Sequence, residues 1–234
     1  MAEIRTSNLT DHVTEVLGRS IVSGEYEAGA VFQINELCIT FNASRTVMRE
    51  AVKALAAKGM VTSRASVGSI VRAEADWNLS DPDVLSWFLH GRGSRLKLIR
   101  EFNDFRIAIE PTAAALAAAS DDEEAIAAIF TALERMRAAE RGEDDSLDAD
   151  VEFHVAILKA SGNRLFYNMR HTIDVALRIS IRVTNRQKAV AVASAADHAK
   201  VAEAVRDKDE NGAREAMLNL LIEARQLLRE PTPL

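Results

Sequence analysis

Residues 36–61 read E-L-C-I-T-F-N-A-S-R-T-V-M-R-E-A-V-K-A-L-A-A-K-G-M-V, and this stretch decides the fold of the first part of the chain. Its apolar residues recur at helical spacing and predict one buried helix face, made of Val47, Met48, Ala51, Val52 and Leu55. Ser44 is a good N-cap, and Gly59 suits the C-terminal end. We therefore expect a helix over about 45–58, with a shorter helix over 35–41 before it.

The neighbouring segments complete a small domain. Apolar residues at helical spacing predict another helix over 9–23, which Gly24 ends. After Gly59, two β-rich segments at 60–63 and 69–71 flank the loop 64–68. Three helices followed by a β-hairpin are typical of a winged helix-turn-helix.

The character of the sequence changes in the second part of the chain. Residues 74–93 combine turn signals with a short apolar stretch, so we expect a linker with a short helix. No strand pattern follows, and an all-α bundle is predicted, with helices at about 94–118, 121–140, 146–160, 163–190, 195–208 and 210–229. The expected fold is mainly α, with domains at 1–73 and 94–234.

Charge is unevenly distributed along the 234 residues. The net charge is −6, yet the window 37–73 contains six basic residues and one acid, Glu50, and so has a charge of +5. A basic patch on an acidic body suits a protein whose first part binds a polyanion. No run of eighteen apolar residues and no signal-peptide pattern is present, so we expect a cytoplasmic protein without membrane contact.

The helix over 45–58 has a polar face that fits DNA. An α-helix fits the major groove, where Arg45 and Arg49 can each donate two hydrogen bonds to guanine, while Ser44 and Thr46 can bond phosphates. A solvated helix face is the alternative. The wing, with Arg64, Ser66 and Gly68 at its expected tip, favours DNA.

The stretch 36–61 resembles the DNA-binding domain of the GntR family of bacterial transcription regulators, whose signature reads E-L-A-x-x-F-x-V-S-R-T-x-V-R-E-A-L-x-x-L-x-x-x-G-L-V. The resemblance spans 9–72. It implies that Arg45, Thr46 and Arg49 meet operator DNA, the two arginines at guanines, and that Gly68 enters the minor groove. It implies phosphate or positioning contacts for Ser44 and Asn35, although F-Q-I-N at 32–35 departs from the L-P-S-E of many relatives.

A second motif, Asp150-x-x-x-His154, puts a carboxylate and an imidazole one helical turn apart. This spacing suits two ligands of one metal ion, and an exposed helical pair is the alternative. The segments 105–118, 150–163 and 197–217 resemble the ligand-sensing domain of the FadR subfamily. The resemblance implies a divalent ion such as Zn²⁺, Ni²⁺ or Mn²⁺ on Asp150, His154 and His198, with Leu220 at the position of a fourth ligand.

The effector is expected to be a small organic acid. The same resemblance places Arg106 facing the cavity, and a guanidinium binds a carboxylate with two hydrogen bonds. Asn163, Arg178 and Arg225 are further candidates for ligand contacts. The linker D-W-N-L-S-D-P-D-V-L-S-W (76–87) resembles that of sugar-acid regulators, which indicates an aldonate or hexuronate.

Three functions remain open from the sequence. The first is a homodimeric repressor that its ligand releases from operator DNA. The second is a metal-dependent hydrolase or isomerase built on Asp150, His154 and His198, which lacks a motif such as H-E-x-x-H and leaves the winged helix unexplained. The third is a FadR-like acyl-CoA sensor, disfavoured because the Asp/His set marks the organic-acid branch. We expect a regulator and no enzymatic activity.

Overall fold

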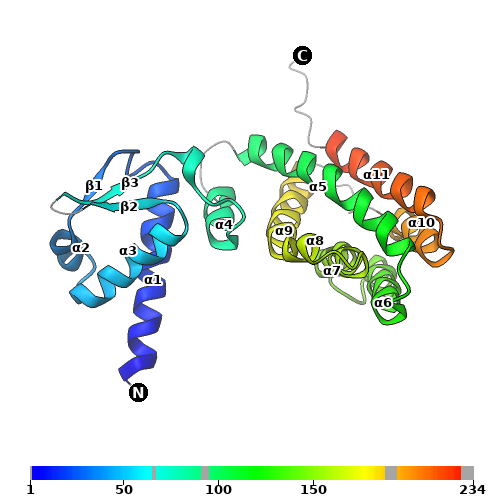
Figure 1. Cartoon of the computed structure of the whole chain (residues 1–234), viewed down its shortest axis with the longest axis horizontal. Helices are drawn as coiled ribbons and strands as arrows, with labels where there is room; N and C mark the ends of the chain where they lie inside the picture. The colour runs from blue at the N-terminus through cyan, green and yellow to red at the C-terminus, as the bar shows by residue number, and fades with distance from the viewer. Residues whose placement is uncertain (1, 65–66, 91–94, 188–193, 228–234) are drawn as a thin grey trace, which may run out of the picture. The chain divides into compact units, whose positions relative to one another are not determined.

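The computed structural model describes residues 2–64, 67–90, 95–187 and 194–227. The chain divides into two compact units, Met1–Arg95 and Leu96–Leu234 (Figure 1). The first combines helices with a small sheet, and the described part of the second is helical. The predicted fold class, mainly α with an N-terminal winged helix-turn-helix and a C-terminal helical bundle, is confirmed.

The first unit has the element order of a winged helix-turn-helix. Its elements are α1 (Ala2–Val22), β1 (Val31–Phe32), α2 (Ile34–Thr40), α3 (Arg45–Ala57), β2 (Val61–Arg64), β3 (Gly68–Val71), a 3₁₀ helix (Glu74–Asp76) and α4 (Pro82–His90). The strands form an antiparallel sheet in the order β1-β3-β2. In this sheet Arg64 pairs with Gly68, at the two ends of the wing loop.

Helix α3 forms as the sequence predicts. The Ser44 hydroxyl accepts a hydrogen bond from the Val47 amide at 3.3 Å and so satisfies one of the free donors of the first turn. All five residues of the predicted stripe are buried, and they pack in one core with Leu17 of α1 and Met60. This packing leaves the opposite face of α3 free.

The sheet contains one strand more than the predicted hairpin. Strand β1 has only two residues: Val31 pairs with Ile70 and Phe32 pairs with Ser69. A two-residue strand is too short for an alternating pattern to be visible in the sequence. The Phe32 side chain is 3% exposed and joins the core, so β1 fastens the start of α2 to the wing.

The expected linker packs against the helices of the first unit. Lys58, the C-cap of α3, lies 2.8 Å from Asp81 and 2.8 Å from Asp83. Asp81 also accepts hydrogen bonds from the first amides of α4. On the same helix Trp87 is buried, and it lies so close to Gly18 of α1 that an added Cβ would overlap its ring. The end of α3 is thus tied to α4.

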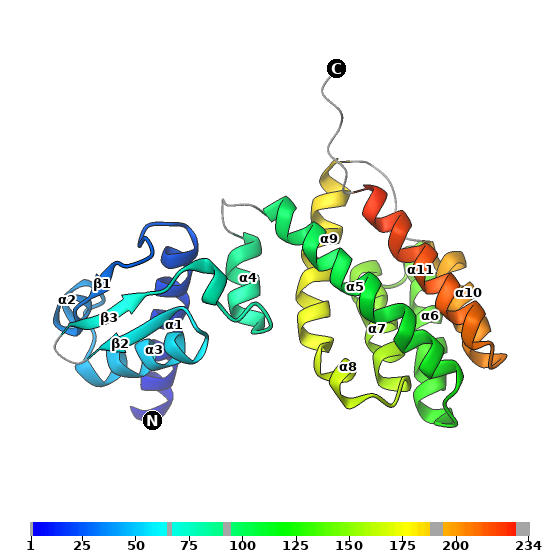
Figure 2. The same cartoon turned by 45° about the horizontal axis from the view of Figure 1, so that its top comes forward.

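The second unit is a bundle in its described part. Its helices are α5 (Arg95–Ala118), α6 (Glu123–Glu140), α7 (Ser146–Ala160), α8 (Arg164–Asn168), α9 (Arg170–Gln187), α10 (Ala195–Arg206) and α11 (Glu210–Leu227). Helices α5 and α11 run side by side (Figure 2), joined by a hydrogen bond from Asn103 to the Leu221 carbonyl. Helix α7 packs against α6, α8 and α9 and has nine buried residues among its fifteen, so it forms the centre of the bundle.

The helix predicted over 163–190 is interrupted. The Met169 amide bonds to the Phe166 carbonyl, three residues back, and this tighter turn ends α8. The Arg170 side chain donates to the Tyr167 carbonyl and stacks on its ring, occupying an acceptor that a continuous helix would use internally. No helix in the described part of the chain is long and apolar enough to span a membrane.

Gly59 provides a test of this packing. It has φ +77°, and an added Cβ would lie 2.6 Å from the Asp76 carbonyl oxygen, whereas Gly24 has φ +79° with open space around it. We expect Gly24→Ala to lower the free energy of unfolding by about 1–2 kcal/mol from backbone strain alone. Gly59→Ala should lower it by about 1–3 kcal/mol more, because backbone must move.

Denaturant unfolding followed by tryptophan fluorescence measures both variants, since Trp77 and Trp87, the two tryptophans of the chain, lie in the first unit. An equal decrease in the free energy of unfolding of the two variants would show that the close contact with the Asp76 carbonyl does not constrain residue 59.

Candidate functional site

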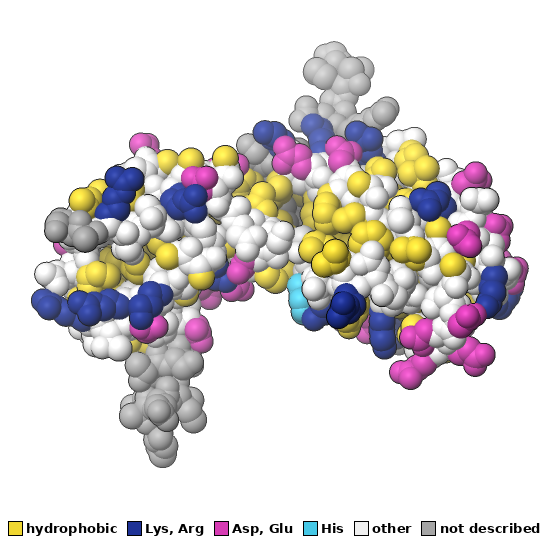
Figure 3. Space-filling view, viewed as in Figure 1, with side chains coloured by type: hydrophobic (Ala, Val, Ile, Leu, Met, Phe, Trp, Pro, Cys, Tyr) yellow, Lys and Arg dark blue, Asp and Glu magenta, His cyan; other side chains and the backbone are white. Residues whose placement is uncertain are grey.

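The free face of α3 presents a basic surface. Ser44, Arg45, Thr46 and Arg49 are all exposed on the first turns of α3. No carboxylate in the described residues forms an ion pair with Arg45 or Arg49. Figure 3 shows Lys and Arg side chains in a row across the visible face of the first unit. Unpaired arginines on a rigid helix are free to donate to a polyanion.

The other predicted DNA contacts lie around the wing. Asn35 is exposed on α2, and Arg64 is exposed at the end of β2. Ser66 lies outside the described residues. Gly68 has φ +116°, and an added Cβ would lie 2.6 Å from the Phe32 carbonyl oxygen, so the close approach of β1 requires glycine there.

The sequence did not indicate a role for Gln33. Its side chain makes no cap bond to α2 and instead donates to the Val67 carbonyl at 2.7 Å. The amide therefore braces the wing loop against the start of α2. Its place in the stretch F-Q-I-N, where the sequence departs from the family pattern, was the available signal.

Five polar side chains meet inside the second unit. Helix α5 contributes Arg106 and Glu110, α7 contributes Asp150 and His154, and α10 contributes His198. Each pair on one helix is four residues apart and so faces the same way. All five residues are at most 5% exposed, in an interior made mostly of apolar residues, where uncompensated charge is unstable. We call this group the buried cluster.

Glu110 holds two members of the buried cluster. One carboxylate oxygen lies 2.6 Å from Arg106 Nε, and the other lies 2.6 Å from His154 Nδ1. Burial raises the pKa of Glu110, but the electrostatic and hydrogen-bond interactions with Arg106 and His154 outweigh burial and lower this pKa to about 2. Glu110 is therefore an ionised acceptor at neutral pH. No motif in the sequence indicated a role for Glu110.

His198 has one ring nitrogen without a hydrogen-bond partner. Its Nδ1 lies 3.1 Å from the Ser194 carbonyl, which can only accept, so Nδ1 bears the hydrogen. The other ring nitrogen, Nε2, lies 3.2 Å from an Asp150 carboxylate oxygen without a hydrogen bond. A bare lone pair facing a carboxylate is unfavourable, so this contact calls for a positive charge between the two atoms, either a proton on Nε2 or a metal ion.

The donor set fits a divalent metal ion. The ligand atoms of Asp150, His154 and His198 lie within 4.8 Å of one another, and all three residues are buried. Burial raises the pKa of Asp150, but His198, His154 and Arg106 outweigh it and lower this pKa, which keeps the carboxylate ionised. One carboxylate and two imidazoles suit Zn²⁺, Ni²⁺ or Mn²⁺. Leu220 is 5% exposed and offers no donor atom.

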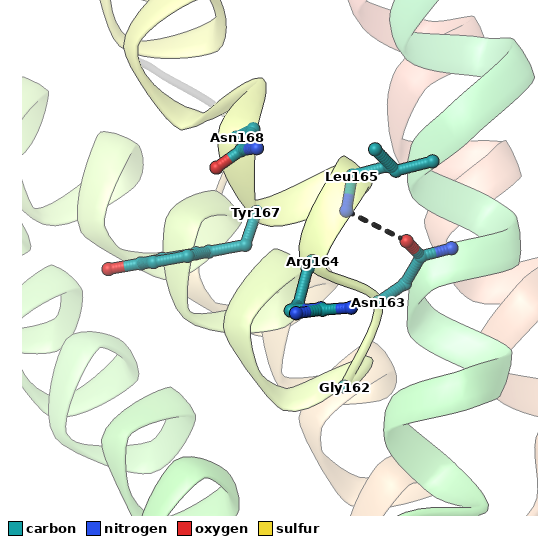
Figure 4. Close-up of a pocket in the computed structure, with 6 residues that line it drawn as sticks. All are labelled: Gly162, Asn163, Arg164, Leu165, Tyr167 and Asn168. Carbon is teal, nitrogen blue, oxygen red and sulfur yellow. Dashed lines mark hydrogen bonds between the residues drawn. The ribbon is translucent and has the colours of Figure 1, made fainter.

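The remaining predicted ligand contacts have partners elsewhere. Arg178 on α9 forms ion pairs with Asp148 and Asp174, and Arg225 on α11 lies 3.1 Å from Asp104. The Asn163 side chain accepts a hydrogen bond from the Leu165 amide and caps α8 (Figure 4). The structure brings Arg106 into the buried cluster and gives these three side chains other roles.

Asn163 borders a separate surface cavity of about 730 Å³. Figure 4 shows the lining residues, which come from the turn after α7 and from α8. The cavity is lined by one short segment of the chain, and its residues are not those of the buried cluster. The buried cluster is therefore the stronger candidate for a specific ligand.

Comparisons with known proteins agree with both units. Residues 9–71 match the family described as bacterial regulatory proteins, gntR family, and residues 101–223 match the FCD domain. The galactonate operon transcriptional repressor of Escherichia coli (strain K12) is 29% identical over 229 residues, 97% of this chain and 100% of that protein. An uncharacterized HTH-type transcriptional regulator of the same organism, YieP, is 34% identical over 175 residues, 70% of this chain and 76% of that protein.

A solved structure described as Streptococcus agalactiae GntR shares the fold. It has a TM-score of 0.52 at 22% sequence identity and covers 93% of this chain and 99% of its own.

The buried pair of Glu110 predicts a large effect on stability. Glu110→Gln leaves the Arg106 guanidinium without its charged partner, and we expect the free energy of unfolding to fall by about 3–5 kcal/mol. Glu101→Gln is the matched control, because Glu101 pairs with Lys97 at the same spacing on α5 but is exposed. Its loss should stay below about 1 kcal/mol. Far-UV circular dichroism during denaturant unfolding measures both.

The same carboxylate predicts a pH dependence. The pKa of Glu110 is about 2 in the folded chain against an ordinary value of 4.5. Its contribution to stability is therefore complete above about 4.5 and is lost as the pH falls toward 2. The loss on acidification should be smaller in Glu110→Gln, and an identical pH profile in both proteins would contradict the assignment.

Proposed function

Because the chain belongs to the gntR family of bacterial regulatory proteins and carries an FCD domain, we propose that it represses a catabolic operon and that a small organic acid releases it from operator DNA. The chain is a DNA-binding transcription regulator and not an enzyme. The observation that supports the proposal most strongly is the buried cluster, which places a guanidinium, two carboxylates and two imidazoles inside the bundle.

A sugar acid is the proposed effector. The chemistry of the buried cluster suits a small hydrophilic anion, whose carboxylate Arg106 can bind with two hydrogen bonds. An acyl chain would instead need an apolar cavity, so the acyl-CoA alternative gains no support. The similarity over the whole length of the galactonate operon repressor supports an aldonate or hexuronate.

Asp150, His154 and His198 are the proposed ligands of a divalent metal ion. Such an ion supplies a Lewis acid for carboxylate or hydroxyl oxygens of the effector. Ser194 supports the site, because its carbonyl fixes the ring of His198 and directs Nε2 toward Asp150. Leu220 leaves the protein with three donors, so the effector and water would have to supply any further ligands of a bound ion.

The first unit is the proposed operator contact. Arg45 and Arg49 read guanines in the major groove, with Ser44, Thr46 and Asn35 on phosphates and the wing residues Arg64, Ser66 and Gly68 beside the minor groove. A homodimer in the cytoplasm would present two such units to a two-fold operator. The effector can release DNA only by its different affinity for the DNA-competent and incompetent arrangements.

Removing two arginines tests the operator contact. Arg45→Ala with Arg49→Ala should weaken binding to the protein's own upstream DNA at least about tenfold, since each bidentate contact is worth about 1–3 kcal/mol. Arg137→Ala with Arg141→Ala is the control, because it removes the same charge from a half-exposed and an exposed position of the second unit. Fluorescence anisotropy measures both; equal affinities for the two double variants would refute the contact.

A thermal-shift screen tests the effector and the metal. A sugar acid that binds the folded chain should stabilise it by about 2.7 kcal/mol at one hundred times its Kd. The shift should disappear with a chelator and in His198→Ala, yet persist in His171→Ala, whose imidazole is exposed. If the shift survives both the chelator and His198→Ala, the metal has no part in effector binding.

A further inference from the structure

We infer that the Arg106 guanidinium and a divalent cation on Nε2 of His154 compete, through charge repulsion, for the space beside the His154 ring, so that cation binding frees Arg106 for the effector. The inference rests on the proposed function, because it concerns the same metal and effector site. It adds a regulatory relation between two groups that the proposal treats as independent. Three contacts of the described residues support it.

The first contact fixes the tautomer of His154. Its Nδ1 lies 2.6 Å from the Glu110 carboxylate, which is ionised beside the buried guanidinium and can only accept. Nδ1 therefore bears a hydrogen. Nε2 is then the nitrogen that His154 can offer to a metal ion. Glu110 is accordingly a positioning residue for the metal site.

The second contact places a positive charge beside that nitrogen. Arg106 Nη2 lies 3.1 Å from His154 Nε2 and 3.3 Å from Nδ1. Nη2 is nearly equidistant from the two ring nitrogens, so the guanidinium lies over the face of the ring and not in the direction of the Nε2 lone pair. A metal ion on Nε2 would stand close to this charge, and two positive charges at such a distance repel each other. Cation binding therefore favours a position of the guanidinium farther from the ring.

The third contact keeps Arg106 in place. Its Nε lies 2.6 Å from Glu110, and this carboxylate is 0% exposed. The guanidinium therefore remains tethered to α5 when Nη2 leaves His154, so its plane can turn toward a carboxylate ligand. Leu220 strengthens the competition, because without a donor there the site has three protein ligands, and a nearby positive charge then lowers the cation affinity of a weaker site.

Arg106→Met distinguishes competition between the guanidinium and the cation from a role of Arg106 in stabilising the metal site. The variant removes the guanidinium, and we expect it to bind Co²⁺ or Zn²⁺ at least about tenfold more tightly than the natural chain. An arginine that merely stabilises the site would give the opposite result, weaker binding. Calorimetric titration with the metal alone measures the affinity, and the visible absorption of bound Co²⁺ reports that the ligands are the same.

Two further variants make the result interpretable. Arg178→Met is the matched control, an arginine of the same unit whose partners are Asp148 and Asp174; its metal affinity should be unchanged. If Arg106→Met does not fold, Arg106→Gln removes the charge but keeps a donor for Glu110, and the same tightening is expected.

The outcomes distinguish the two proposals. If His198→Ala lowers metal affinity but Arg106→Met and Arg106→Gln bind the metal no more tightly than the natural chain, the competition is refuted and the metal site stands. If His198→Ala binds the metal as well as the natural chain does, the metal site itself is refuted, and the competition with it.

Discussion

The carboxylate of Glu110 is the group on which the second unit depends. It is fully buried, and its two oxygens bond a guanidinium of its own helix and an imidazole of α7. A buried ion pair is stable only when its remaining hydrogen-bonding capacity is satisfied, which requires α5 and α7 to meet in one register. The rest of the buried cluster follows from this arrangement, because it orients His154 toward Asp150 and His198.

The sequence predicted the parts of the structure that rest on local periodicity. Residues close together in the sequence are enough to predict the buried stripe on α3, the Ser44 cap and the helical character of the second unit. The resemblance to a known family named Asp150, His154 and His198, and the structure brings their ligand atoms together. That these atoms hold a metal stays a prediction.

The features that the sequence missed depend on contacts between distant segments. Strand β1 exists because Phe32 reaches the core and pairs with β3, and two residues carry no pattern of their own. Glu110 reads as one more acidic residue of an amphipathic helix, because its partner His154 is forty-four positions away. Gly68 was expected at the wing tip, and only the position of β1 shows that the spacing to Phe32 requires glycine there.

The segment between the two domains belongs to the first unit by its packing. Lys58 at the end of α3 forms ion pairs with Asp81 and Asp83 at the start of α4, and the Trp87 ring packs closely against Gly18 of α1. A change in α4 therefore acts directly on the helix that presents Arg45 and Arg49. The proposed ligand response would have a physical route to the DNA-binding surface through these contacts within the first unit.

We propose that effector binding and operator binding are coupled in one chain. Coupling is reciprocal, so the effector must weaken operator affinity by the same factor by which the operator weakens effector affinity. The direct measurement is the affinity for labelled upstream DNA with and without the sugar acid found by thermal shift, and the affinity for that sugar acid with and without the DNA. We expect each ligand to weaken the binding of the other by the same factor, above about fivefold. An effector that binds the free and the DNA-bound protein equally well would contradict it.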